Sequence, residues 1–210
     1  MNVPKEVDPM EAMALYLFNR KVIRLDPLSL CFTGESILFP PEDEAMLGYL
    51  LYEKTCRLRL NFDTVAALPG TDTRLADMVR QATRSHCARW LDGVYFRQKK
   101  IRPDRLPLLR VSQCTRTVQF GGQAMLVCGV LSGNSDAIME AILALEERSY
   151  QVRDVLALID AENGTEKELN LYGKRCFSMI KQSRMLEVML RNGYLGSSRL
   201  CLHGSLHCVA

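Results

Sequence analysis

The sequence predicts an α/β protein in which a central parallel sheet is covered by helices on both faces. Two observations support this fold class. Segments such as "VRDVLALIDA" are apolar almost throughout, as strands buried on both faces are. Segments with apolar residues at helical spacing, such as "AIMEAILALEER", alternate with these strands along the chain. Hydrophobic residues make up 48% of the chain and charged residues 24%, which argues against disorder.

The expected elements follow from apolar spacing and from their end signals. Helices are expected over 8–18, 43–56, 73–91, 137–148, 165–173 and 183–193, and strands over 21–30, 36–41, 61–70, 93–98, 123–131, 152–161 and 176–180. Pro9 stands just inside the first helix. Thr165 and Glu168 form a capping box at the start of a later helix, and Gly173 and Gly193 end the last two.

The chain of 210 residues is most simply one domain, spanning 1–195, followed by a C-terminal tail over 196–210. Its formal net charge of +3 is too small to imply nucleic-acid binding by itself. The longest apolar runs are too short to span a bilayer, and no basic-then-apolar leader is present. We therefore expect a cytoplasmic protein with no membrane partner, and a nuclear location is left open.

One segment, "QAMLVCGVLSGNSD" at Gln123–Asp136, has the order of a phosphate site. An apolar strand leads through a Ser/Gly/Asn turn directly into a helix. In this order, free backbone N–H groups and the positive end of the helix dipole point at the turn, where they bind phosphate. The acidic residues that usually complete such a site are missing. The segment therefore predicts either a nucleotide site or the remnant of one.

From Phe62 to Leu190, the sequence resembles orotate phosphoribosyltransferase, the first catalytic domain of UMP synthase. The segments that carry the resemblance are "VRDVLALIDAENGTEKELNLYGKRCFSMIKQSRMLEVML" and "FDTVAALPGTDTRLA", in the family's order. "VYFRQKKIRPD" occupies the place of the family's mobile loop, and "LVCGVLSGNSD" that of its loop for phosphoribosyl pyrophosphate (PRPP). The resemblance implies a type I phosphoribosyltransferase fold with a small N-terminal hood over about 1–45. It also implies a homodimer.

The resemblance further implies that the residues of the family's chemistry are replaced here. The two adjacent acids that hold the ribose hydroxyls and accompany Mg²⁺ become Cys128 and Gly129, which supply no hard oxygen ligand. Ala161 replaces the arginine that grips the orotate carboxylate. Cys31 stands near the place of a lysine, and the loop lysine thought to act in catalysis aligns with Arg102, which keeps its proton at working pH. The PRPP loop is also one residue shorter.

These coordinated losses, with the core retained, predict a catalytically inactive relative that binds a protein partner and has lost PRPP and Mg²⁺. Such divergence fits a gene captured and re-used, for example by a virus against its host. An alternative is a nucleotide- or phosphate-binding sensor, or an altered phosphoribosyltransferase. Its contacts would come from Ser132, Gly133, Asn134, Ser135, Arg97 and Lys99. True orotate phosphoribosyltransferase activity is a third hypothesis.

Two other segments carry residues of interest. The tail "CLHGSLHC" holds Cys201, His203, His207 and Cys208, which are zinc-ligand types, but four ligands this close would strain a tetrahedral site. A disordered or loosely docked tail is the simpler interpretation. The basic segment 99–116 offers charges for nucleic-acid phosphates, although a solvated loop is the simpler interpretation there too. The eight cysteines lack the close spacing of a disulfide scaffold, so we expect reduced thiols.

Overall fold

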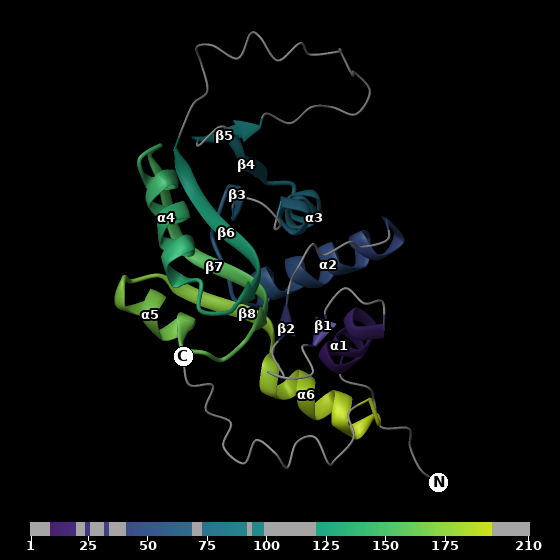
Figure 1. The fold of residues 1–210 in the computed structure, drawn as a ribbon. Helices are drawn as coiled ribbons and strands as arrows, with labels where there is room; N and C mark the ends of the chain where they lie inside the picture. The colour runs from purple at the N-terminus through teal and green to yellow at the C-terminus, as the bar shows by residue number, and fades with distance from the viewer. Residues whose placement is uncertain are drawn as a thin grey trace.

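The computed structural model shows a central sheet with helices on both faces (Figure 1). It describes residues 9–19, 24–25, 32–33, 41–68, 73–91, 94–98 and 121–194. Among these residues, no helix is long and apolar enough to cross a membrane.

Within the described residues, the main sheet has six strands in the order β5–β4–β3–β6–β7–β8. They are β3 (Thr64–Ala67), β4 (His86–Leu91), β5 (Val94–Gln98), β6 (Gly122–Leu131), β7 (Tyr150–Asp160) and β8 (Arg175–Lys181). Neighbouring strands are parallel, except that β5 runs antiparallel to β4 at the edge. The predicted parallel sheet is confirmed. A separate pair, β1 (Arg24–Leu25) and β2 (Phe32–Thr33), is antiparallel.

The helices divide between the two faces of the sheet. They are α1 (Pro9–Asn19), α2 (Pro41–Arg57), α3 (Thr73–Thr83), α4 (Ser135–Glu146), α5 (Thr165–Leu171) and α6 (Gln182–Arg191). Figure 1 shows α4 and α5 on one face and α1, α2, α3 and α6 on the other. All but α3 agree with the predicted helices within a few residues. The predicted hood boundary near residue 45 falls inside α2, and the hood as a separate unit stays a prediction.

The core consists of two hydrophobic clusters, one on each face of the sheet. Strand side chains point to alternate faces, so Met125 and Val127 belong to the cluster under α2, α3 and α6. Leu126 and Cys128, between and after them, belong to the cluster under α4 and α5. All four are fully buried. Each such apolar side chain stabilises the fold by about 1.5–3 kcal/mol, which explains why these strands are apolar at almost every position.

The helix predicted over 73–91 is wrong in its second half. The helix ends at Thr83, Arg84 adopts a left-handed conformation with φ 55°, and β4 begins at His86. No glycine or proline marks this break in the sequence. The segment is a strand because it pairs with β3, where Cys87 lies opposite Val65. The strand predicted over 36–41 is also wrong at Pro41, which begins α2, and its other residues lie outside the described part of the chain.

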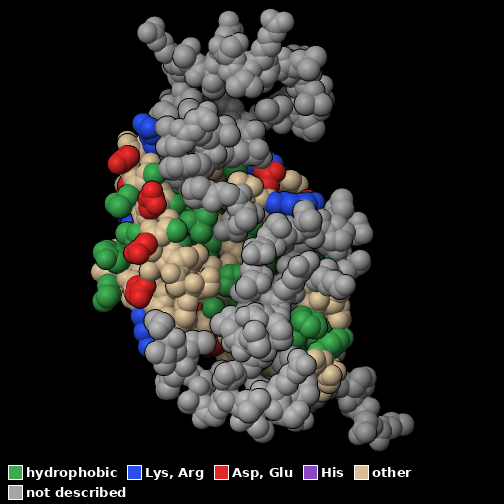
Figure 2. All heavy atoms as spheres, in the orientation of Figure 1, with side chains coloured by type: hydrophobic (Ala, Val, Ile, Leu, Met, Phe, Trp, Pro, Cys, Tyr) green, Lys and Arg blue, Asp and Glu red, His purple; other side chains and the backbone are tan. Residues whose placement is uncertain are grey.

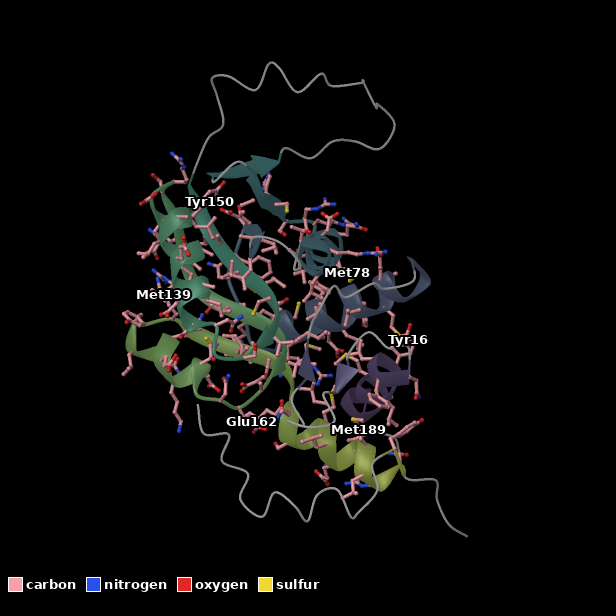
Figure 3. All side chains as sticks on the ribbon, in the orientation of Figure 1. Tyr16, Met78, Met139, Tyr150, Glu162 and Met189 are labelled. Atoms are coloured by element: carbon pink, nitrogen blue, oxygen red, sulfur yellow. The ribbon has the colours of Figure 1, made fainter. Side chains whose placement is uncertain are left out.

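Helices α2 and α3 lie close together at Gly48. A Cβ atom at this position would lie 2.9 Å from the backbone carbonyl oxygen of Met78. Met78, labelled in Figure 3, is itself buried in the cluster between these helices and the sheet. Backbone atoms cannot move aside as a flexible side chain can. The helix pair therefore requires glycine at this position.

We predict that Gly48→Val destabilises the protein, because the new side chain forces α2 away from α3. The expected loss in free energy of unfolding is about 1–3 kcal/mol, measured by urea unfolding. Ala45→Val, at an exposed position of the same helix, is the control, and its effect should stay within about 0.7 kcal/mol. Equal unfolding midpoints for the two variants would contradict this packing argument.

Candidate functional site

The site predicted from the sequence lies at the carboxyl ends of β6 and β7. These strands pair to their last residues, with Leu131 opposite Asp160. The backbone N–H of Ala161 then donates to the carbonyl of Leu131 at 3.0 Å. Because the strands are parallel, the turn into α4 (132–134) and the turn into α5 (161–164) start side by side. The structure therefore brings together the segments that the resemblance assigns to PRPP and to orotate. In parallel sheets, ligands bind at this edge.

Cys128 and Gly129, which the resemblance places at the family's paired acids, lie inside β6. Cys128 pairs with Ala157 of β7, and its side chain is fully buried in the cluster under α4. Gly129 is buried as well. A carboxylate at Cys128 would therefore be placed in an apolar interior, which is unfavourable unless it is paired. These two positions contribute to the core.

Two backbone N–H groups of the turn after β6 are hydrogen-bonded within the protein. Ser132 N–H donates to Oδ1 of Asn134 at 3.1 Å, and Gly133 N–H donates to Oγ1 of Thr165 at 2.9 Å. The Asn134 side chain is held in turn, because its Nδ2 donates to the carbonyl of Val130 at 3.2 Å. Each N–H has a single proton to donate. A phosphate in this turn would have to displace these internal acceptors.

The hydroxyl of Thr165 connects the two turns. It accepts from Gly133 N–H and donates to Oδ1 of Asn163 at 2.8 Å. The turns also touch, because a Cβ on Gly133 would lie 3.2 Å from Nδ2 of Asn163. Thr165 is only 1% exposed, whereas Gly133 is exposed, so this link is partly buried. The turn that would receive phosphate is thus closed against its neighbour.

The predicted capping box at Thr165 is wrong by one residue. The N-cap of α5 is Gly164, with a left-handed φ of 97°, and Thr165 is the first helical residue. The backbone N–H of Glu168 bonds to the carbonyl of Gly164. Because Gly164 makes the turn into the helix, the threonine hydroxyl is left to bond across to the other turn. The C-terminal positions predicted for Gly173 and Gly193 agree with their left-handed conformations.

Two acids, one at the end of β7 and one in the turn after it, hold backbone N–H groups. Oδ1 of the buried Asp160 accepts from Glu162 N–H at 2.8 Å. Oε2 of Glu162 accepts from Ser183 N–H at 2.7 Å, in the first turn of α6, and Figure 3 shows Glu162 beside the start of this helix. A carboxylate at a helix N-terminus is stabilised by the unpaired N–H groups and by the helix dipole. Both acids therefore support the conformation of this turn.

Cys176, in β8 on the α5 side of the sheet, is chemically inert. Burial raises the pKa of its thiol to about 12, and the nearby carboxylates of Glu166 and Asp160 add to the effect. A thiol with this pKa carries almost no thiolate at neutral pH, and the thiolate is the nucleophilic form. The expectation of a reduced core thiol is met here, and Cys87 and Cys128 are also buried and free.

The remaining predicted site residues lie elsewhere or outside the described chain. Arg97 is in β5, separated from β6 by β4 and β3, and its side chain is outside the described set. Also outside the described residues are Cys31, Lys99, Arg102, Cys201, His203, His207 and Cys208. Their proposed roles stay predictions. Within the described ranges, no cluster of three or more His, Cys, Asp or Glu is arranged to hold a metal ion.

No protein-family model matches this sequence. The UMP synthase of Leishmania donovani superposes with a TM-score of 0.69 and 15% identity, over 92% of this chain and 41% of that chain. The orotate phosphoribosyltransferase of Francisella tularensis gives 0.64 and 11% identity over 95% of each chain. That of Mycobacterium tuberculosis, in complex with inorganic phosphate, gives 0.60 and 14% over 85% of this chain and 99% of its own. The chain has an orotate phosphoribosyltransferase-like fold.

At these identities, the likeness to orotate phosphoribosyltransferases concerns the fold alone. The chain spans 41% of the length of the UMP synthase that it matches.

The sequence reasoning missed the parts played by Asn163 and Glu162. The signal was present in "AENGT", where polar residues follow a buried strand and precede a glycine. Asn163 bonds locally to Thr165, whereas the partner of Glu162, Ser183, lies 21 residues away in the sequence.

We predict that Thr165→Val opens the contact between the two turns. The variant removes the acceptor of Gly133 N–H and the donor to Asn163, so the expected loss of stability is about 1–3 kcal/mol. Hydrogen exchange at the Gly133 amide should become faster. Thr165→Ser keeps the hydroxyl and serves as the matched control, with exchange close to that of the unmodified protein. Unchanged exchange in the valine variant would contradict the link.

We also predict that thiol reagents distinguish the cysteines. At pH 8, Cys56, which is exposed, should be alkylated first, and Cys176 should remain protected because its pKa is about 12. The raised pKa also means that folding becomes less favourable as pH rises from the unfolded value near 9 toward 12. Mass spectrometry after timed iodoacetamide treatment measures the order. Equal labelling rates at the two thiols would refute it.

Proposed function

We propose that this protein is a catalytically inactive phosphoribosyltransferase-like protein that acts by binding another protein. The observation that carries the proposal is the closed turn after β6. In a phosphate site of this type the backbone N–H groups must face the ligand. Here the amides of Ser132 and Gly133 already bond to Asn134 and Thr165. Phosphate binding would have to break these bonds before it formed new ones.

The neighbouring positions support the same proposal. Transfer from PRPP requires groups that hold the ribose hydroxyls and its metal ion, and Cys128 is a buried thiol. Recognition of an acceptor carboxylate by a bidentate pair requires an arginine, and Ala161 offers a methyl group that is 7% exposed. Donor and acceptor recognition are therefore both weakened. The helices and strands that hold the sheet remain.

Exposed apolar side chains support a role in protein interaction. Met46, Tyr49 and Tyr52 form an exposed stripe on α2, and Leu143, Leu171 and Tyr172 are exposed on or next to α4 and α5. Figure 2 shows hydrophobic and acidic side chains interleaved on the α4 and α5 side. Contiguous apolar surface on a soluble protein marks interaction sites. We propose a captured viral gene as the origin of this protein. The homodimer is a separate prediction, and analytical sedimentation of the purified protein measures its oligomeric state.

One observation favours the alternative, a sensor that binds phosphate or a nucleotide. The N-cap residue of α4, Asn134, makes no side-chain hydrogen bond to the first N–H groups of that helix. The first N–H groups of α4 and the positive end of its dipole therefore point at the turn formed by Ser132, Gly133, Asn134 and Ser135, where they could bind an anion. A small anion that bonds only to the helix N–H groups would leave the internal bonds of the turn in place.

Titration with PRPP decides between these two functions. We predict no heat and no thermal shift when PRPP is added with or without Mg²⁺, because the turn is closed and the acids are replaced. A ligand at a hundred times its dissociation constant would stabilise the protein by about 2.7 kcal/mol, which thermal unfolding detects easily. An active orotate phosphoribosyltransferase, titrated alongside, is the positive control.

Either of two results would overturn the proposal: micromolar, Mg²⁺-dependent binding of PRPP, or phosphoribosyl transfer to any nucleobase. Binding of inorganic phosphate that shifts the amides at 131–135, without PRPP binding, would support the sensor. A negative titration directs the search to a protein partner. Cross-linking of the folded chain in cell extract, with Leu171→Ser as a surface variant, then tests whether the exposed apolar side chains contribute.

A further inference from the structure

We propose that the protein has a second binding site, at the edge of the sheet opposite the closed turns, for a phosphate or carboxylate carried on a flat organic body. A pocket of about 400 Å³ lies there, where α2 and α3 end and β3 and β4 begin. Its walls include Tyr52, Phe62, Arg59, Arg84 and His86. This volume lies in the range of small-molecule sites, about 300–1,000 Å³.

Two unneutralised arginines line this pocket. The other arginines of α2 and α3 whose side chains are described are each paired with a carboxylate: Arg57 with Glu53, Arg74 with Glu44 and Arg80 with Asp77. Among the described residues, Arg59 and Arg84 have no such ion pair. Arg59 and Arg84 differ from the paired arginines in position, because each lies just beyond the end of a helix and lines the pocket. Their charges are therefore available to a ligand.

The backbone positions of these arginines are also unusual. Arg59 and Arg84 both have left-handed conformations, with φ of 51° and 55°. After α5 and α6 the chain has Gly173 and Gly193 in this conformation, and after α4 it has Ser149, with φ of 65°. The end of α2 has the same hydrogen bonds as these glycine ends, since Arg59 N–H donates to the carbonyl of Cys56 and the next N–H reaches one residue further back.

Glycine would suit both helix ends better if only the turn mattered, because a side chain in this conformation costs about 1–2 kcal/mol. The helix dipole favours a cation at either C-terminus. It does not require both guanidinium groups to line one pocket. A shared anionic ligand gives a reason for both arginines, since each guanidinium presents a planar fork that matches a carboxylate or phosphate.

The rest of the lining fits an anion with an apolar body. The hydroxyls of Thr83 and Ser85, 2.8 Å apart, are bonded within the protein, because that of Thr83 donates to the carbonyl of Val79, so the two arginines carry the recognition of the anion. The acid of the pocket, Asp63, is already engaged, because its Oδ1 accepts from the hydroxyl of Thr64 at 2.6 Å. Two guanidinium groups against one carboxylate leave the lining with a positive charge. Tyr52, 38% exposed, offers an aromatic face against which a flat ring can stack.

The test is titration of the full chain with AMP, UMP, inorganic phosphate and the uncharged nucleosides, followed by amide chemical shifts. We expect the nucleotides to shift amides at 59–63 and 83–86 and to bind more tightly than either phosphate or the nucleosides. Arg59→Gln with Arg84→Gln should weaken nucleotide binding at least about tenfold, since charged hydrogen bonds are worth about 1.5–3 kcal/mol each. Arg57→Gln, which alters a paired arginine outside the pocket, should leave affinity unchanged.

This inference is independent of the proposed function, because the two sites lie at opposite edges of the sheet. Thr165→Val, which alters only the closed turns, should retain nucleotide binding in the pocket. Shifts confined to 131–135, or affinity equal in the double arginine variant and in Arg57→Gln, would overturn it. So would the absence of binding by any of these probes at millimolar concentration. All the arginine changes are at exposed positions, and circular dichroism checks that each variant is folded.

Discussion

The pairing of β6 with β7 is the constraint on which the rest of the structure depends. It runs from Gly122 opposite Tyr150 to Leu131 opposite Asp160, through strands that are buried on both faces. One face packs under α4 and α5 and the other under α2, α3 and α6, so the same two strands anchor both hydrophobic clusters. Because the pairing continues to the last residue of each strand, the two turns that follow are held next to each other.

This arrangement gives a structural reason for the proposed loss of phosphoribosyl transfer in a fold that resembles that of the orotate phosphoribosyltransferases. Regular pairing up to Leu131 keeps Cys128 inside the strand, where its side chain stabilises the core. The short turns that remain lie close enough to bond to each other through Thr165. A turn whose N–H groups have partners in the protein has less to gain from a ligand. The same hydrogen bonds therefore stabilise the turns and support the proposed loss of phosphate binding.

The two edges of the sheet differ in how their polar groups are satisfied. At the carboxyl edge, the side chains of Asp160, Glu162 and Asn163 accept hydrogen bonds from backbone or side-chain groups of the protein. At the amino edge, Arg59 and Arg84 keep their charge beside an open pocket, although the arginines near them on the same helices are paired. Groups that are satisfied internally stabilise the chain, and groups left unpaired are available for recognition. This difference supports the proposed binding site at the amino edge of the sheet.

The sequence by itself determined the order of most helices and strands, the parallel sheet and the glycine ends of α5 and α6, because apolar spacing and glycine conformation are local properties. It also carried the resemblance that the structural comparisons confirm for the fold. Tertiary structure decided that 86–91 is a strand, since nothing local marks the turn at Arg84 and pairing with β3 selects the extended form. It also decided that Gly133 bonds to Thr165, 32 residues away. No local pattern encodes such a bond, because it exists only once the sheet has placed both turns at one edge.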